Sequence, residues 1–349
     1  MFSRLRKLYS NDVGIDLGTA NTLVYLGGHG IVLNEPSVVA VNQKTGRVVA
    51  VGAQAKQMLG RTPAHIKAIR PLVDGVISDF EITEELIAYL MNRVNEVVKK
   101  PINPRVVVGV PTGITNVEIR AVYDATKNAG AREVYIIEEP MAAAIGIRLP
   151  IHDAEGSMIV DIGGGTTDIA VISLAGIVRS KALKIAGDKM NNDIISYLRD
   201  EFKLLIGEKT AENIKITIGG VREDTPQEMI ARGRDLVTGL PREVIVTDVD
   251  IREAMLASVM QIVDATKEVL ETTPPEILSD IMNRGIILTG GGALIQGLAP
   301  LMQHHLKIPV SIAEDPLSAV ARGTGIILEN IDRFKEVLIS HHDDISPRF

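Results

Sequence analysis

The chain has 349 residues, 46% of them hydrophobic and 23% charged, which are globular proportions in a chain long enough for two domains. A formal charge of −7, without a basic stripe interleaved with aromatic residues, argues against a nucleic-acid partner. The absence of cysteine excludes disulfides, thiolate nucleophiles and cysteine metal sites, and fits a reducing cytoplasm. We find no cleavable signal peptide and no uncharged apolar run of about 18 residues.

The first ten residues predict a short basic amphipathic helix. At about 100° per residue one stripe collects the apolar side chains, and Arg4, Arg6 and Lys7 lie at or behind its borders. The pattern favours an interfacial membrane anchor, with its cations on anionic headgroups. The alternative is a frayed terminus that docks on the body. One copy would bind weakly, but an array of copies would gain avidity. The proposed membrane-facing residues are Met1, Phe2, Leu5, Leu8 and Tyr9.

Residues 13–25 predict a β-hairpin whose turn carries an acid, a glycine and hydroxyl residues. Asp16 stands at the end of the first strand, and Gly18 and Thr19 follow it. Such a turn lets backbone N–H groups approach an anion. Taken alone, it is equally well read as an ordinary glycine-rich hairpin.

A small inserted subdomain is predicted next, with a hairpin over residues 38–41 and 48–51 and a helix over 53–59. Thr83 before two glutamates predicts the N-cap of an amphipathic helix. Further on, a strand at 105–111, a helix at 116–128 and a strand at 134–137 alternate, which predicts α/β architecture with a largely parallel sheet.

Residues 138–146 predict a helix with Pro140 in its first turn and a run of small residues that could serve as a hinge between the two halves of the chain. Glu139 is a candidate for orienting a water molecule. The simpler interpretation is an acid that complements the helix dipole.

The pattern of that turn, an acid at a strand end followed by glycines and hydroxyl residues, is repeated at residues 160–168, and we call it the recurring phrase. There Asp161 is followed by three glycines and two threonines. The recurrence predicts two related lobes that face each other across a cleft and clamp one polyphosphate between their turns. Carboxylates beside phosphates require a hard cation, so we expect Mg²⁺ together with a nucleotide.

The second half predicts a helix that begins near Gly187 and continues over 194–205, and a loop and helix over 207–215. A polar inserted subdomain with a strand at 244–246 follows, and then a long helix over 251–270. A strand at 285–289 leads into three glycines and a helix over 294–304. Three glycines at a helix N-terminus would let a flat or phosphorylated ligand lie on bare backbone, although a tight turn is the alternative. A strand at 309–312 and a helix at 316–328 complete the body.

These motifs resemble the actin, Hsp70 and sugar-kinase ATPase superfamily and, within it, the MreB family of bacterial actins. The resemblance covers about residues 11 to 328, through motifs at 16–22, 139–146, 161–168 and 289–293. It implies an α/β, actin-like ATPase fold of two related lobes, each with a mixed, mainly parallel sheet, plus two inserted subdomains. The implied first lobe is 1–33, 70–150 and 322–349, with insertion 34–69; the second is 151–187 and 252–321, with insertion 188–251.

The resemblance also implies roles for individual residues. Asp16 and Asp161 would hold Mg²⁺ mostly through water, and Glu139 and Thr166 would orient the attacking water. The implied phosphate-binding residues are Thr19, Ala20, Asn21, Gly163, Gly164 and Gly165. The implied nucleoside-binding residues are Gly187, Glu212, Asn213, Ile214, Lys215, Gly290, Gly291, Gly292 and Ala293.

The implied function is a slow, polymerisation-coupled Mg–ATPase that forms filaments and determines rod cell shape by organising wall synthesis. Its implied partners are further copies of the chain in paired protofilaments, the anionic inner face of the cytoplasmic membrane, and membrane morphogenesis proteins such as RodZ and MreC. Some relatives insert an apolar loop into membranes, but residues 97–104 here contain Lys99 and Lys100 and no aromatic. Membrane contact is therefore expected at residues 1–9. A chaperone or a small-molecule kinase of the same superfamily is the alternative.

Overall fold

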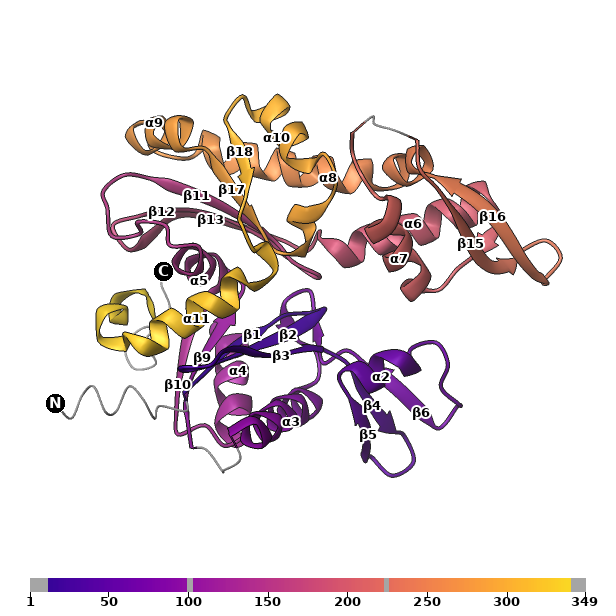
Figure 1. The fold of residues 1–349 in the computed structure, drawn as a ribbon, viewed down its shortest axis with the longest axis horizontal. Coiled ribbons are helices and arrows are strands. Elements are labelled where there is room, and N and C mark those ends of the chain that lie inside the picture. The colour runs from indigo at the N-terminus through magenta and orange to yellow at the C-terminus, as the bar shows by residue number, and fades with distance from the viewer. Residues whose placement is uncertain (1–11, 99–102, 223–225, 340–349) are drawn as a thin grey trace.

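A computed structural model describes residues 12–98, 103–222 and 226–339 as two lobes, one above the other in Figure 1. The predicted membrane-facing segment and Lys99 and Lys100 lie outside the described residues. Each lobe is built on one five-stranded mixed sheet. Among the described residues, no helix is both long and apolar enough to span a bilayer.

We call the lower lobe in Figure 1 lobe I and the upper one lobe II. The lobe I sheet combines an antiparallel hairpin with parallel strands. Strand β1 pairs antiparallel with β2 and parallel with β9, so the turn after β1 lies at the same sheet edge as the end of β9. These strands are rich in valine and isoleucine because both of their faces are covered. The sheet order is β10 (Glu133–Glu138), β9 (Arg105–Val110), β1 (Val13–Leu17), β2 (Asn21–Leu26) and β3 (Gly30–Pro36).

The lobe II sheet repeats this arrangement strand for strand. Strand β11 pairs antiparallel with β12 and parallel with β17. The sheet order is β13 (Gly176–Leu183), β12 (Thr167–Ser173), β11 (Ser157–Ile162), β17 (Ile286–Thr289) and β18 (Val310–Ile312). The two lobes predicted from the recurring phrase are therefore related in topology as well as in local sequence.

Two helices fill the space between the lobes. Helices α5 (Glu139–Gly146) and α11 (Ala319–Glu329) pack closely on each other; α11 also contacts the lobe I sheet, and α5 contacts both sheets. A buried apolar cluster joins them to Val107 and Ile137 of lobe I and to Ile159 and Ile172 of lobe II. The lobes thus share a continuous core on this side.

The remaining large helices cover the outer faces of the sheets. Helices α3 (Phe80–Val98) and α4 (Asn116–Asn128) bury their apolar stripes against lobe I. Helices α8 (Asp248–Glu271), α9 (Pro275–Arg284) and α10 (Leu298–Leu306) belong to lobe II, where α8 supplies much of the core. Side-chain capping boxes at Thr115 and Thr247 define the starts of α4 and α8.

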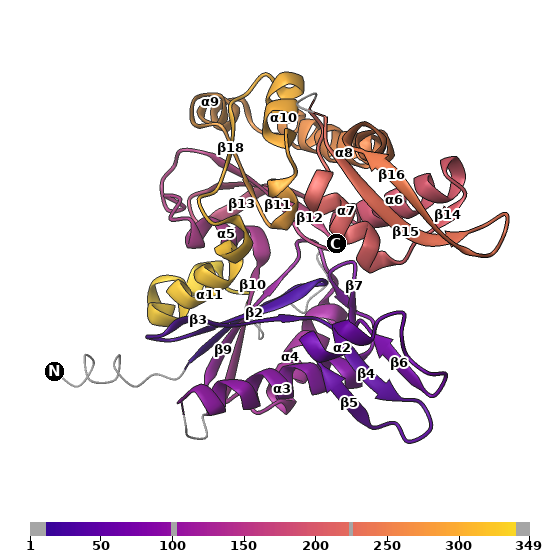
Figure 2. The ribbon, with the colours of Figure 1, turned by 45° about the vertical axis from the view of Figure 1, so that its right-hand side comes forward.

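Both lobes carry a smaller unit at the same end of the molecule, on the right in Figures 1 and 2. The lobe I unit contains β4 (Val39–Asn42), β5 (Val48–Val51), α2 (Ala53–Met58) and β6 (Ile66–Ile69). The lobe II unit contains α6 (Gly187–Glu201), β14 (Leu204–Leu205), α7 (Glu208–Ile218), β15 (Glu228–Asp235) and β16 (Pro241–Thr247). The short β7 (Leu72–Val73) and β8 (Val76–Ile77) lead back to lobe I. The domain boundaries given above stay predictions.

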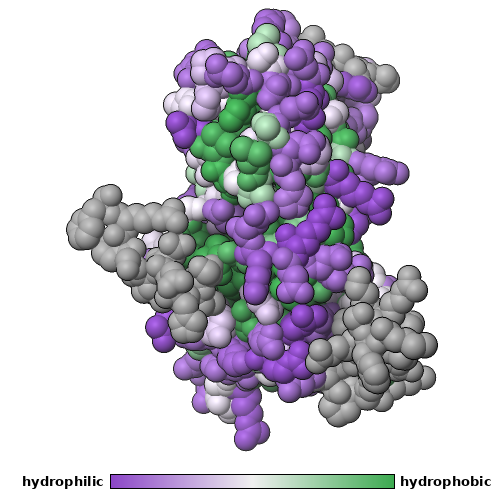
Figure 3. All heavy atoms as spheres, turned by 90° about the vertical axis from the view of Figure 1, so that its left-hand side faces the viewer, coloured by the Kyte–Doolittle hydropathy of each residue, from purple (hydrophilic) through white to green (hydrophobic). Residues whose placement is uncertain are grey.

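The opposite end, seen in Figure 3, carries apolar patches on both lobes within a largely polar surface.

Two predicted helix boundaries are wrong. Helix α3 begins at Phe80, and Thr83 lies buried inside it; the carboxylate of Asp79 accepts from the Ile82 N–H at 3.1 Å and caps the helix instead. Helix α6 ends at Glu201, since Leu204–Leu205 leaves it to form a strand that pairs with β15. Tertiary pairing prevails there over a local apolar pattern that also fits a helix.

The predicted helix over 294–304 is also wrong at its start. The three glycines lead into a 3₁₀ turn at Gly291–Leu294, and α10 begins only at Leu298. Gly297 separates the two with φ +80°, and a Cβ there would lie 2.5 Å from the Arg222 Cβ. The glycines therefore do not sit at the N-terminus of an α-helix.

Candidate functional site

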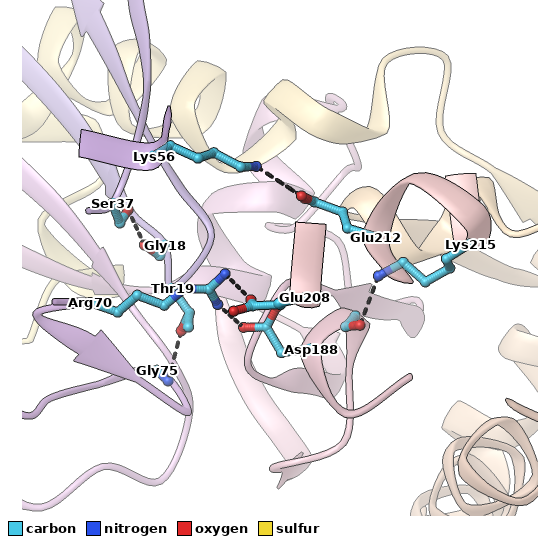
Figure 4. Close-up of polar contacts among 11 residues, drawn as sticks. Gly18, Thr19, Ser37, Lys56, Arg70, Gly75, Asp188, Glu208, Glu212 and Lys215 are labelled. Carbon is cyan, nitrogen blue, oxygen red and sulfur yellow. Dashed lines mark hydrogen bonds and ion pairs between the residues drawn. The ribbon is translucent and has the colours of Figure 1, made fainter. Parts of the chain in front are cut away.

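The first glycine turn connects β1 to β2 and is tied down by a serine from the end of β3. A Cβ on Gly18 would lie 2.6 Å from the carbonyl oxygen of Asn21, so this tight turn requires glycine. The Ser37 hydroxyl donates to the Gly18 carbonyl at 2.6 Å (Figure 4) and forms a 2.8 Å hydrogen bond with the Thr22 hydroxyl. Ser37 thus holds the turn in one position.

The second turn connects β11 to β12 and meets the first turn directly. The Gly163 N–H donates to the Thr166 carbonyl at 2.9 Å and closes the turn. A Cβ on Gly164 would lie 2.6 Å from the Ala20 Cβ, and one on Gly165 would lie 2.5 Å from the Thr19 Oγ1. Only glycine allows the two lobes to approach this closely, so the glycines of one turn fit the hydroxyl face of the other.

A cavity of about 470 Å³ lies between the two turns and the helices of lobe II. It brings together most of the residues singled out in the sequence. Those lining it are Asp16, Thr19, Ala20, Asn21, Glu139, Asp161, Gly163, Gly164, Gly165, Thr166, Gly187, Glu212, Lys215, Gly290, Gly291 and Gly292.

Three residues of the predicted nucleoside site do not line this cavity. Ile214 and Ala293 are fully buried in the lobe II core, and Asn213 lies on the exposed face of α7. Glu212, Lys215, Ile216 and Gly219 lie on the cavity side of the same helix. Their spacing of three or four residues is that of one helical face, which residues 213 and 214 do not share.

Carboxyl groups gather where the two turns meet. Burial raises the pKa of Asp16 to about 7. Burial also raises the pKa of Asp161 and of Glu139 well above the ordinary range, and neighbouring carboxylates add to both shifts. Anionic oxygen atoms packed so closely repel one another, so a bound cation would lower the free energy of this arrangement.

A fourth acid of this group, Asp168, was not among the predicted site residues. Its Oδ1 accepts from the Thr112 N–H at 2.7 Å and from the Thr112 hydroxyl at 2.8 Å, across the gap between the lobes. Burial raises the pKa of Asp168, whereas the bonds from Thr112 and Thr166 lower it. Its place in the recurring phrase, seven residues after Asp161, was the available signal.

The start of helix α6 docks on the second turn. The Gly187 and Asp188 N–H groups donate to the Gly163 and Gly164 carbonyls at 3.2 and 2.8 Å. Lys215 of α7 donates from Nζ to the Gly187 carbonyl at 2.7 Å (Figure 4), and burial lowers its pKa. The second turn, α6 and α7 therefore form one connected wall.

The glycine triplet forms another part of the wall, and packing accounts for two of its members. A Cβ on Gly290 would lie 2.4 Å from the Asp161 Oδ1, and one on Gly292 would lie 2.2 Å from the Ile162 Cγ2. The end of β11 thus requires glycine at both positions, so the triplet alone is not evidence for a ligand. Its place on the cavity wall is a separate observation.

Sequence reasoning also missed Asn191, which lines the cavity with its Oδ1 buried and without a hydrogen-bond partner. Asn191 follows Gly187 by one helical turn, a spacing that could have indicated it. An unpartnered buried acceptor in a polar cavity is suited to a ligand that brings its own donor.

The cavity residues fit a magnesium nucleotide in chemical type. Two facing turns offer backbone N–H groups and threonine hydroxyls to phosphate, and Asp16 and Asp161 offer the oxygen ligands that Mg²⁺ prefers. Within the described ranges, no three histidine or acidic side chains converge to enclose a metal ion by themselves.

Comparisons with known proteins point in the same direction. The family model described as MreB/Mbl protein matches residues 10–336. Among curated proteins, the cell shape-determining protein Mbl of Bacillus subtilis is 51% identical over 335 residues, covering 95% of this chain and 100% of that protein.

Solved structures give a similar result. MreB5 of Spiroplasma citri bound to ADP is 40% identical with a TM-score of 0.89, covering 94% of this chain and 99% of that one. The same protein bound to AMPPNP gives 39% and 0.88, with coverages of 94% and 98%. A MamK double helical filament is similar in fold, with 24% identity, a TM-score of 0.77 and coverages of 91% and 98%.

Proposed function

The chain belongs to the MreB/Mbl family of actin-like proteins, and from that premise we propose that it is a filament-forming cytoskeletal ATPase that determines cell shape. The observation that carries the proposal is the contact between two glycine turns of related lobes, with one cavity behind them. A polyphosphate bound there would contact both lobes, which requires both turns. The ADP and AMPPNP complexes of MreB5 support a nucleotide as the ligand.

We propose that the terminal phosphate of ATP favours the closed arrangement of the lobes. Thr19, Ala20 and Asn21 would approach the β- and γ-phosphates from lobe I, and Gly163, Gly164 and Gly165 would approach them from lobe II. A ligand that contacts both turns stabilises the closed state by its differential affinity for that state. A closed molecule presents one fixed surface to the next copy, so closure would favour polymerisation, and loss of the terminal phosphate would weaken the polymer.

Glu139 and Thr166 are the proposed residues that orient the attacking water. Glu139 is 9% exposed at the start of α5, and both residues line the cavity. With its raised pKa, Glu139 is suited to accept a hydrogen bond from water and to hold a proton briefly. Turnover would be slow until both lobes are fixed, because a misplaced water loses most of the benefit of positioning.

Asp16 and Asp161 are the proposed holders of Mg²⁺, which when bound would neutralise charge on the phosphates. Replacing Asp161 by Ala should reduce Mg–ATP hydrolysis by on the order of 100-fold, measured as phosphate release. The matched control is Asp153→Ala, an exposed acid of the same lobe whose loss should leave the rate unchanged. Full activity in Asp161→Ala would remove the metal role.

The N-terminal segment is the proposed membrane contact, by its sequence alone. Replacing Phe2 and Leu5 by Glu should release filaments from anionic liposomes, because the apolar stripe would then carry charge. Val117, which is 78% exposed on α4, provides the control, since Val117→Glu adds charge elsewhere on the surface. Unchanged co-sedimentation of the double variant would exclude the anchor.

Filament formation is tested by negative-stain microscopy of the full chain with lipid, with and without Mg–ATP. We expect filaments on the lipid surface when nucleotide is present, and their absence in all conditions would contradict the proposal. Paired protofilaments, a peripheral place on the inner face of the cytoplasmic membrane, and contact with RodZ and MreC stay predictions.

A further inference from the structure

Two cations of lobe I reach across the mouth of the cavity to acids of lobe II. Arg70, just after β6, binds Asp188 through Nη1 at 2.7 Å and Glu208 through Nη2. Lys56 of α2 contacts both carboxylate oxygens of Glu212, at 3.0 and 3.1 Å. Figure 4 shows the two cations extending from lobe I and the acids extending from lobe II. We call them the cross-cleft pairs.

Two of the three acids are part of the cavity itself. Asp188 and Glu212 line it, and both side chains are less than one third exposed, at 27% and 28%. Burial raises the pKa of Asp188, whereas the charges of Arg70 and Lys215 lower it. A carboxylate on the wall of a site for a polyphosphate repels that ligand unless a cation compensates it.

The charge balance at the mouth depends on both lobes. Lobe II alone supplies Asp188, Glu208 and Glu212 against Lys215, a net charge of −2. Arg70 and Lys56 of lobe I bring the balance to zero. Compensation is complete only when the small units of the two lobes are close enough for the pairs to form.

We infer that Arg70 and Lys56 are positioning residues for nucleotide, which neutralise the acidic wall of lobe II from the opposite lobe and so couple retention of a polyphosphate to cleft closure. The inference rests on the proposed function and names residues outside the recurring phrase. Partly exposed ion pairs contribute little to folding stability. Their effect on a highly charged ligand is larger, because each uncompensated carboxylate acts on every phosphate charge.

The experiment measures equilibrium affinity of the full chain for ATP, ADP and adenosine, with Mg²⁺, by isothermal titration. Arg70→Gln should weaken ATP binding on the order of tenfold, ADP binding less, and adenosine binding less than twofold. Lys56→Gln, tested as an independent variant, should lose affinity in the same order: ATP most, ADP less and adenosine least. Arg70→Lys should keep most of the affinity, since it keeps the charge.

A double variant separates charge from shape. Asp188→Asn added to Arg70→Gln removes the uncompensated carboxylate and should restore most of the ATP affinity. The matched control is Arg93→Ala, which removes an exposed arginine of lobe I paired within α3 and should change no affinity.

An equal loss for all three ligands, no loss in either Gln variant, or no recovery in the double variant would overturn the inference. Failure of the unaltered chain to bind ATP would instead contradict the proposed function itself. The two failures are therefore distinguishable.

Discussion

The lobes are joined on two sides of the cavity by opposite kinds of contact. On one side α5 and α11 pack with fully buried apolar side chains from both sheets around them. Across the mouth, the cross-cleft pairs join partly exposed charged side chains. Salt does not screen apolar contacts, whereas it screens partly exposed ion pairs, and an anionic ligand competes for their cations.

This difference explains how one chain can hold its lobes together and still respond to a ligand. The α5–α11 side uses small residues to bring helix backbones together: a Cβ on Gly146 would lie 1.9 Å from the Ala319 carbonyl oxygen, and one on Gly323 would lie 1.8 Å from that of Ala142. The contacts across the mouth are instead made by the ends of long charged side chains, Arg70 and Lys56. We therefore expect the α5–α11 side to determine folding stability and the mouth to determine ligand retention.

The largest effect should come from Gly323→Ala, which breaks the packed side. The added Cβ would overlap the backbone of α5, and backbone cannot move aside as a flexible side chain can. We expect a loss of at least about 3 kcal/mol in the free energy of unfolding, measured by chemical denaturation. Gly207→Ala is the control, since no atom lies within 4 Å of its added Cβ. Near-native stability of Gly323→Ala would show that the helices can separate at little cost.

A smaller effect is expected from Asp168→Ala, which removes the carboxylate that Thr112 bonds across the interior of the cleft. The Thr112 N–H and hydroxyl would lose a buried acceptor, at a cost of about 2 kcal/mol in unfolding free energy. Thr112→Ser keeps both donors and should be nearly neutral. If Asp168→Ala proved as stable as the unaltered chain, the Thr112–Asp168 contact would contribute as little to folding stability as the cross-cleft pairs are expected to.

The smallest effect on stability should come from Arg70→Gln, although this variant is expected to lose nucleotide. The Arg70 side chain is 21% exposed and its partners more so, which limits the contribution of the pairs to about 1 kcal/mol or less. Melting temperatures at low and high salt provide the measurement: the difference between variant and unaltered chain should shrink as salt rises. A loss of stability as large as that of Gly323→Ala would show that the mouth contributes as much to folding stability as the α5–α11 side.

Much of the fold was open to prediction because it depends on local pattern. The apolar runs and the turn residues between them identified both hairpins, and the range predicted for α4 agrees with the structure residue for residue, since Thr115 and Glu118 form a capping box. The recurrence of an acid, glycines and hydroxyls predicted two related lobes, and the matching strand orders confirm it. The MreB/Mbl relationship suggested by the same motifs is confirmed by the family match.

The start of α3 was misplaced for a local reason, since Asp79 rather than Thr83 caps it. The other errors occurred mainly where contacts distant in sequence decide the outcome. Leu204–Leu205 has the composition of a helix end, but β15 offers it a strand partner. The glycine triplet resembled a helix start, yet the end of β11 and the position of Gly297 produce a 3₁₀ turn and a later helix. Ile214 and Ala293 adjoin cavity residues in sequence but point into the core.

What the amino-acid order determined by itself is the local chemistry: two acid-and-glycine turns, the strands that carry them, and the kind of ligand that such turns suit. Only the tertiary structure decided which residues meet across the gap between the lobes, such as Thr112 with Asp168 and Arg70 with Asp188. The physical reason is that turn and helix preferences act over a few residues. A cross-lobe ion pair between positions 118 residues apart depends on how two completed sheets pack together.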